Sequence, residues 1–213
     1  MFITNLILVL VVLSNLKLLG SSRLGASIRV VAVQGVILGF LPLLAHWHEM
    51  SVHFALLALG TILIKGVVFP WFLFRAIREA EIAREIEPYV GYAASLVTGA
   101  VTLGLSFWLC ARLPVPGAIT SPWLVPVSFF SIFAGLFLIV SRKRAVSQVL
   151  GFLVLENGIY TFGVGVVVKT PFLVEVGVLL DVFVAVFVMG IIIFHINREF
   201  DHIDTGRLSA LKD

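Results

Sequence analysis

Long apolar stretches, separated by short polar connections, fill almost the whole chain. A helix needs about 20 predominantly apolar residues to cross the hydrocarbon core of a bilayer. Seven stretches come close to that length, at residues 2–19, 30–47, 52–74, 91–110, 123–141, 148–168 and 172–196. The pattern therefore predicts an all-α fold, a polytopic membrane helix bundle of about seven transmembrane helices.

Composition supports this membrane class. The chain has 213 residues, of which 60% are hydrophobic and only 13% charged, and its mean hydropathy is +1.12. Such a chain cannot hide its apolar surface in a water-soluble core. The longest connection, residues 75–90, leaves no room for a soluble catalytic domain. We expect a multi-pass protein of the cell inner (cytoplasmic) membrane, in which any chemistry takes place inside the bilayer.

Basic residues fall on alternate connections, which predicts the orientation. One side carries Arg23, Arg29, Arg75, Arg78, Arg84, Arg142, Lys143, Arg144, Arg198, Arg207 and Lys212, whereas the other carries Arg112 and Lys169. Basic connections stay in the cytoplasm, so the N-terminus is expected outside and the C-terminal tail inside. The sequence pI near 9.3 is then a topology signal. It favours contact with anionic membrane lipids and not with nucleic acid.

A Pro-rich connection suggests a division of the chain. Three prolines lie in residues 112–122, which we expect to form an external loop between two groups of helices. The predicted units are residues 1–111 with about four spans, this loop, residues 123–196 with three helices, and a cytoplasmic tail at 197–213. A weak similarity between Ala32–Phe40 and Ala145–Phe152 leaves an internal duplication open, as in repeat-built transporters.

Two acids stand near the middle of successive apolar stretches, Glu156 in one and Asp181 in the next. A carboxylate at the centre of a membrane helix costs about 2.5–3.5 kcal/mol, so it usually faces protein and marks an ion or proton path. The alternative is a structural hydrogen bond between helices. Low dielectric favours the neutral carboxyl form, which can take up and release a proton near neutral pH. We therefore predict a proton relay through Glu156 and Asp181.

Three further residues are candidates for the same relay. Lys65 lies inside the third stretch, where it either extends its stem to water at the interface or pairs with an acid and exchanges protons. Glu175 lies near the external end of the last stretch, where a solvated rim acid is the alternative. His195 lies at the opposite end of that stretch and returns to nearly the face of Asp181, although interfacial histidines are common.

A cofactor or metal site is not expected in this chain. Cys110 is the single cysteine, so no disulfide within the chain and no cysteine-ligated cluster can form. His46, His48, Glu49 and His53 could bind a metal by composition, but their spacing favours an interfacial role.

The C-terminal motifs resemble a known family. Val149–Tyr160, Pro171–Gly190 and His195–Phe200 are similar to hydrogenase-4 component E, a membrane subunit of formate hydrogenlyase-type complexes. The resemblance extends over the whole chain, with its specific motifs concentrated in residues 141–213.

The last three predicted helices also resemble the three-helix subunit K of NADH-quinone oxidoreductase and the related small cation/proton antiporter subunit. Asp181 matches the acid of that family's last helix. Glu156 is displaced, because an alignment on Gly151 and Asn157 puts the usual acid at Leu153, one turn away. More loosely, Lys65–Trp71 resembles a lysine-aromatic-proline stretch of the large antiporter-like subunits.

The resemblance implies a non-catalytic membrane subunit of a complex I-like, group 4 [NiFe]-hydrogenase or formate hydrogenlyase-type complex. Its partners would be large antiporter-like membrane subunits and peripheral hydrogenase and iron–sulfur subunits. The NiFe centre and the clusters would belong to those partners. Two alternatives remain open, a self-sufficient secondary transporter and a structural membrane scaffold without a relay role.

Overall fold

The structure is a computed structural model, and it describes residues 2–45, 52–79, 88–113, 121–166 and 190. The elements in this part of the chain are all helices, which confirms the all-α prediction. They are α1 Phe2–Leu19, α2 Leu24–Gly39, α3 Leu41–Ala45, α4 Val52–Leu63, the π-helical turn η2 Ile64–Val68, α5 Phe69–Glu79, α6 Tyr92–Arg112, α7 Leu124–Ser141 and α8 Ala145–Val166.

Six helical segments in the described residues are long and apolar enough to cross a membrane. They are Phe2–Leu19, Leu24–Leu44, Ala58–Arg78, Tyr92–Arg112, Leu124–Ser141 and Ala145–Val164. The chain is thus a multi-pass membrane protein. The predicted seventh span, 172–196, and the tail after it lie outside the described residues. The total of seven spans, the division into units and the orientation therefore stay predictions.

The second span begins earlier than predicted. Its helix starts at Leu24, whereas the apolar pattern placed the start at residue 30, just after Arg29. Arg29 lies on the exposed side of the helix, so its long stem can run along the helix while the guanidinium reaches toward the interface. A basic residue at a span end therefore does not mark where the helix begins.

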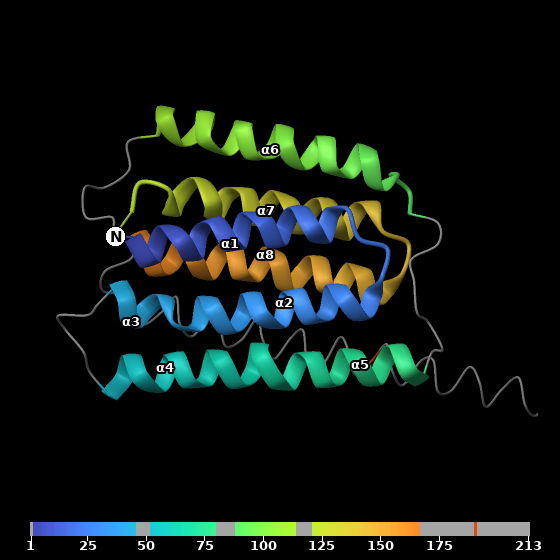
Figure 1. Cartoon of the computed structure of the whole chain (residues 1–213), viewed down its shortest axis with the longest axis horizontal. Helices are drawn as coiled ribbons and strands as arrows, with labels where there is room; N and C mark the ends of the chain where they lie inside the picture. The colour runs from blue at the N-terminus through green and yellow to red at the C-terminus, as the bar shows by residue number, and fades with distance from the viewer. Residues whose placement is uncertain (1, 46–51, 80–87, 114–120, 167–189, 191–213) are drawn as a thin grey trace, which may run out of the picture.

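Four helices form the centre of the bundle, with one layer on each side. Figure 1 shows α1, α2, α7 and α8 between α6 on one side and the α4–α5 segment on the other. α1 packs against α7, and α2 packs against α8 and α4, while α6 contacts α7 and α1. Helices far apart in the sequence therefore build one common core.

Basic connections gather at one end of this bundle. The α1–α2 turn, the end of α5 and the α7–α8 turn lie together, opposite the N-terminus (Figure 1). Arg23 and the run Arg142–Arg144 belong to these turns, and Arg75 and Arg78 to the last turns of α5. This arrangement matches the alternation of charge along the sequence, because successive membrane spans reverse direction.

Glycines allow α7 and α8 to approach each other closely. A Cβ on Gly151 would come within 2.8 Å of Ile139 N and 2.9 Å of Gly135 O. One on Gly158 would lie 2.7 Å from Ile132 N. The obstacles are backbone atoms, which cannot turn aside as a side chain can. Small residues at such an interface are how membrane helices gain packing contacts without a hydrophobic driving force.

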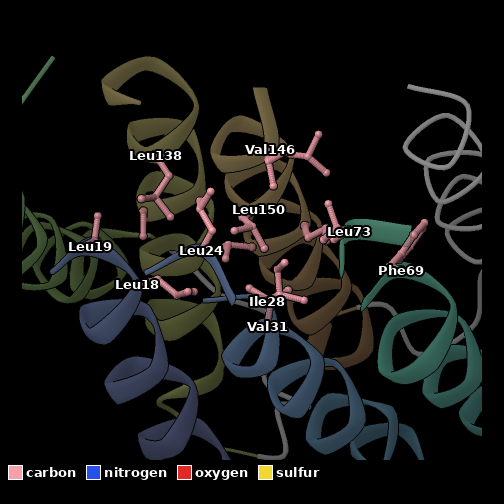
Figure 2. Packing of buried hydrophobic residues seen from close by; sticks show 14 of the residues in the cluster. Leu18, Leu19, Leu24, Ile28, Val31, Phe69, Leu73, Leu138, Val146 and Leu150 are labelled. Carbon is pink, nitrogen blue, oxygen red and sulfur yellow. The ribbon is translucent and has the colours of Figure 1, made fainter. Parts of the chain in front are cut away.

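Buried apolar side chains form two clusters, one toward each end of the bundle. The larger lies toward the basic end and includes Leu18, Ile28, Phe69, Leu138 and Leu150, from five helices (Figure 2). The smaller consists of Ile7, Leu8, Val11, Leu38, Leu41, Leu124 and Val127. The buried polar side chains described next lie between these clusters along the helices.

Candidate functional site

Lys65 and Glu156 form a buried ion pair near the middle of the bundle. The Nζ atom of Lys65 lies 2.8 Å from Oε1 of Glu156, and their side chains are only 7% and 4% exposed. Lys65 stands near the middle of the continuous helical segment Val52–Glu79, and Glu156 near the middle of α8. Opposite charges so far from bulk water interact strongly, because little solvent screens them.

The π-helical turn η2 carries Lys65. Pro70 has no N–H to donate, and its ring crowds the carbonyl of the residue four positions earlier. The helix accommodates this with a wider turn, in which the Phe69 N–H donates to Ile64 O, five residues back. Such π turns occur often at functional sites. The helix thus passes Pro70 with a π-helical turn that contains Lys65.

A glycine of α2 makes room for the same turn. A Cβ on Gly35 would come within 2.6 Å of the Cβ of Lys65, so no side chain fits there without displacement. A Cβ on Gly66 would likewise lie 2.5 Å from Cγ2 of Val36. These two close contacts hold α2 against η2 and bring α2 to the ion pair.

Hydrogen-bonded amides extend from the ion pair across the bundle. Lys65 Nζ also donates to Asn157 Oδ1 at 3.2 Å, and Asn157 Nδ2 donates to Gln34 Oε1 at 3.4 Å. Gln34 Nε2 donates to Asn15 Oδ1 at 3.0 Å, and Asn15 Nδ2 donates to Ser131 Oγ at 2.8 Å. We call these six residues, Lys65, Glu156, Asn157, Gln34, Asn15 and Ser131, the polar layer. It joins α1, α2, η2, α7 and α8.

Every member of the polar layer is buried. Asn15 and Ser131 are 0% and 1% exposed, and Gln34 and Asn157 are 2% exposed. Ser131 completes the series by donating to the carbonyl of Val127 on its own helix. Tyr160 adds a further contact, because its ring centroid lies 5.3 Å from Lys65 Nζ, within the range of a cation–π interaction.

The chemistry of the layer divides into two parts. Lys65 and Glu156 are the two members of the layer whose side chains are ionisable. An amide donates and accepts hydrogen bonds but does not give up a proton under ordinary conditions. The chain of amides therefore orients the pair and supplies it with fixed dipoles. Of the six members, only the two of the ion pair therefore have the chemistry that a proton relay requires.

Of the predicted relay residues, the structure brings Lys65 and Glu156 together. It contradicts the interpretation in which Lys65 extends to water. Its Nζ is turned inward to Glu156 and Asn157, and its side chain is only 7% exposed. Asp181, Glu175 and His195 lie outside the described residues. Their part in a relay, and that of the ion pair, stay predictions.

Leu153, where the family pattern would place an acid, belongs to the larger apolar cluster and is 3% exposed. The acid of α8 is therefore at Glu156, one turn further on, where Lys65 meets it. The side chains of His46, His48, Glu49 and His53 lie outside the part described. Among the described residues, no group of three or more His, Cys, Asp and Glu side chains could hold a metal ion.

Sequence alone does not single out Asn15, Gln34 and Ser131. The available signal is a polar residue within an apolar stretch, but that signal does not say which way the side chain points. Arg142 is similar, because the sequence places it in a basic connection, yet it is only 2% exposed. Its Nη2 donates to Leu19 O at 2.6 Å, and its guanidinium lies 4.7 Å from the ring centroid of Tyr92. Arg142 thereby connects α1, α6 and the end of α7.

Comparison with known proteins gives a relative that matches almost the whole chain. The chain is 33% identical over 208 residues to the uncharacterized protein Rv0085 of Mycobacterium tuberculosis. The matched region covers 95% of this chain and 92% of Rv0085. The chain belongs to the Rv0085 family. This membership assigns no activity, because that relative is itself uncharacterized.

A second similarity is more distant. The chain is 30% identical over 119 residues to hydrogenase-4 component E of Escherichia coli. The matched region covers 53% of this chain and 54% of that relative. The same values hold for hydrogenase-4 component E of Shigella flexneri. The resemblance inferred from sequence motifs is confirmed to this extent, as a partial similarity. No protein-family model and no solved structure matches the chain.

Proposed function

We propose that this protein is a membrane subunit of a complex I-like, group 4 [NiFe]-hydrogenase or formate hydrogenlyase-type complex. Its role there is to contribute the Lys65–Glu156 pair to a proton or cation path. The observation that carries the proposal is this buried ion pair at mid-bundle. The partial similarity to hydrogenase-4 component E supports the type of complex. The chain contributes no catalytic residue, and the NiFe centre and iron–sulfur clusters belong to partner subunits.

The pair would act by passing one proton between its two members. Transfer from the Lys65 ammonium to the Glu156 carboxylate leaves a neutral amine and a neutral acid, and the total charge is unchanged. Glu156 then releases the proton to a further acceptor, and Lys65 takes up another from the opposite side. Charge movement in a neighbouring subunit favours one state or the other. Asp181, Glu175 and His195 are the proposed further members of this path.

Co-purification tests membership of the complex. A C-terminally tagged chain is isolated from native membranes in mild detergent, and the co-purifying proteins are identified by mass spectrometry. We expect a [NiFe]-hydrogenase pair, iron–sulfur subunits and large antiporter-like subunits. A chain that purifies alone and monodisperse would overturn the proposal and favour the secondary transporter.

Proton translocation in sealed inverted vesicles tests the relay. Glu156→Gln keeps the size of the side chain but cannot carry a proton. We expect the redox turnover of the complex to persist while the number of protons moved per turnover falls strongly, because the path has lost one of its ionisable groups. Glu79→Gln, at the last residue of α5, is the matched control and should translocate normally. Normal translocation by Glu156→Gln would instead indicate a structural scaffold.

A further inference from the structure

α1 and α2 enclose a groove that opens on the side of the bundle. Its volume is about 520 Å³, within the range of roughly 300–1,000 Å³ that is usual for ligand pockets. Leu10, Leu13 and Val33 line its walls, and they are 42%, 56% and 58% exposed. Gln34 lies at the buried side of the groove. In a membrane-spanning bundle, walls of this kind face lipid.

Two cations stand at one end of the groove. Lys17 belongs to the last turn of α1, and Arg29 to the second turn of α2. The two helices are antiparallel and joined by the four residues 20–23, so both side chains lie toward the basic end of the bundle. Both are exposed, and none of the described residues that line the groove is acidic. The groove is thus mostly apolar along its length and positively charged at its mouth.

The cations at the mouth of the groove and its apolar walls at membrane depth indicate which class of ligand fits. A ligand that matches both parts has an anionic head at interface depth and a hydrocarbon tail that runs into the bilayer. Basic pockets between membrane helices on the cytoplasmic side bind acidic lipid headgroups. We propose that the groove binds an anionic phospholipid. Its phosphate lies between Lys17 and Arg29, and one acyl chain runs along Leu10, Leu13 and Val33.

The groove also adjoins the polar layer. Gln34 lines the groove and, through the same side chain, donates to Asn15 and accepts from Asn157. An acyl chain in the groove would therefore pack next to Gln34, a member of the polar layer. The proposal concerns lipid binding and does not depend on the protein being part of a hydrogenase complex.

Native mass spectrometry and thermal unfolding of the detergent-purified chain test the site. Phosphatidylglycerol is the probe, and phosphatidylcholine is the neutral comparison. We expect phosphatidylglycerol to be retained preferentially and to raise the unfolding temperature. In the double variant Lys17→Gln/Arg29→Gln, affinity for phosphatidylglycerol should fall about thirtyfold, as expected for two basic residues near an anionic surface.

Two further variants separate this site from general attraction to a basic protein. Arg23→Gln/Arg78→Gln removes two exposed charges from the same end but outside the groove, and should change the affinity by less than about threefold. Val33→Trp fills the groove and keeps both cations, so it should lower retention even if the double variant does not fold. Equal retention of both lipids, or an unchanged affinity in Val33→Trp, would overturn the proposal. Equal losses in the two charge variants would do so as well.

Discussion

At the scale of single residues, the effect of the Lys65–Glu156 ion pair on stability depends on whether one partner or both are replaced. Removal of one partner from a buried pair leaves an uncompensated charge in low dielectric, whereas replacement of both by apolar residues is often neutral. The pair therefore adds little net stability. Net stabilisation alone therefore does not account for an ion pair in the middle of an apolar bundle.

Lys65→Met and Glu156→Met should each lower the free energy of unfolding by about 3–5 kcal/mol, because each leaves one buried charge without its counterion. The double variant should recover most of that loss. Thermal or denaturant unfolding in detergent micelles measures all three. Additive losses in the double variant would contradict this account of the pair.

Arg142 provides a second prediction at this scale. Its guanidinium donates to the last carbonyl of α1 and lies over Tyr92, so Arg142→Gln should lower the free energy of unfolding by about 2–3 kcal/mol. Lys143→Gln is the matched control, because Lys143 is exposed and its contact with the Tyr89 ring, 5.4 Å from Nζ to the centroid, should contribute at most about 1 kcal/mol. Equal unfolding temperatures for the two variants would argue against a role for Arg142 in joining the helices.

At the scale of elements, the π turn decides which way Lys65 points. An α-helix advances by about 100° per residue, so one extra residue in the turn re-aims every side chain before it. With η2 in place, Lys65 faces α8 and α2 and meets Glu156 and Asn157. Pro70 indicates from sequence that the helix must deviate. The deviation could equally have been a bend.

The close contact between α7 and α8 can be tested by adding a methyl group at a contact glycine and, as a control, at a glycine outside the contact. Gly151→Ala should destabilise the protein, because the new Cβ would lie 2.8 Å from Ile139 N and the helices would have to separate. Gly104→Ala on α6 meets nothing within 4 Å and should be neutral or stabilising by up to about 1 kcal/mol. Thermal unfolding of the two variants side by side tests this, and equal effects would show that the close approach does not matter.

At the scale of the whole molecule, the basic end of the bundle predicts how it lies in the membrane. The turns that carry Arg23 and Arg142–Arg144 lie together at this end. Lys17 and Arg29, the cations of the groove between α1 and α2, lie toward the same end. Cytoplasmic connections are enriched in Lys and Arg, so this end should face the cytoplasm.

Thiol labelling tests the orientation, because Cys110 is the single cysteine and can be replaced. In a Cys110→Ser background, Ser22→Cys lies in the turn between α1 and α2, and Leu113→Cys lies just past the end of α6. A membrane-impermeant maleimide should label Leu113→Cys in intact cells and Ser22→Cys only after permeabilisation. The reverse pattern would place the N-terminus inside.

The sequence by itself determined the membrane class and the approximate positions of the six described spans, and it singled out Lys65 and Glu156 as candidates. It could do so because bilayer thickness dictates the length of an apolar stretch and because a buried charge is costly wherever it occurs. The sequence placed the start of α2 too late, because Arg29, whose side chain can extend along the helix to the interface, resembles the end of the preceding connection. Asp181, Glu175 and His195 lie outside the described residues, so their roles stay predictions.

Only the tertiary structure decided that Lys65 and Glu156 are partners, and that Asn157, Gln34, Asn15 and Ser131 continue their contacts. These residues come from helices far apart in the sequence. Whether their side chains meet depends on the rotation of each helix about its axis and on how closely neighbours approach. The hydropathy of a helix that is apolar on every side does not indicate which face packs inward. The rotation of the helix around Lys65 and the close approach of its neighbours therefore followed only from the π turn and the glycine contacts in the structure.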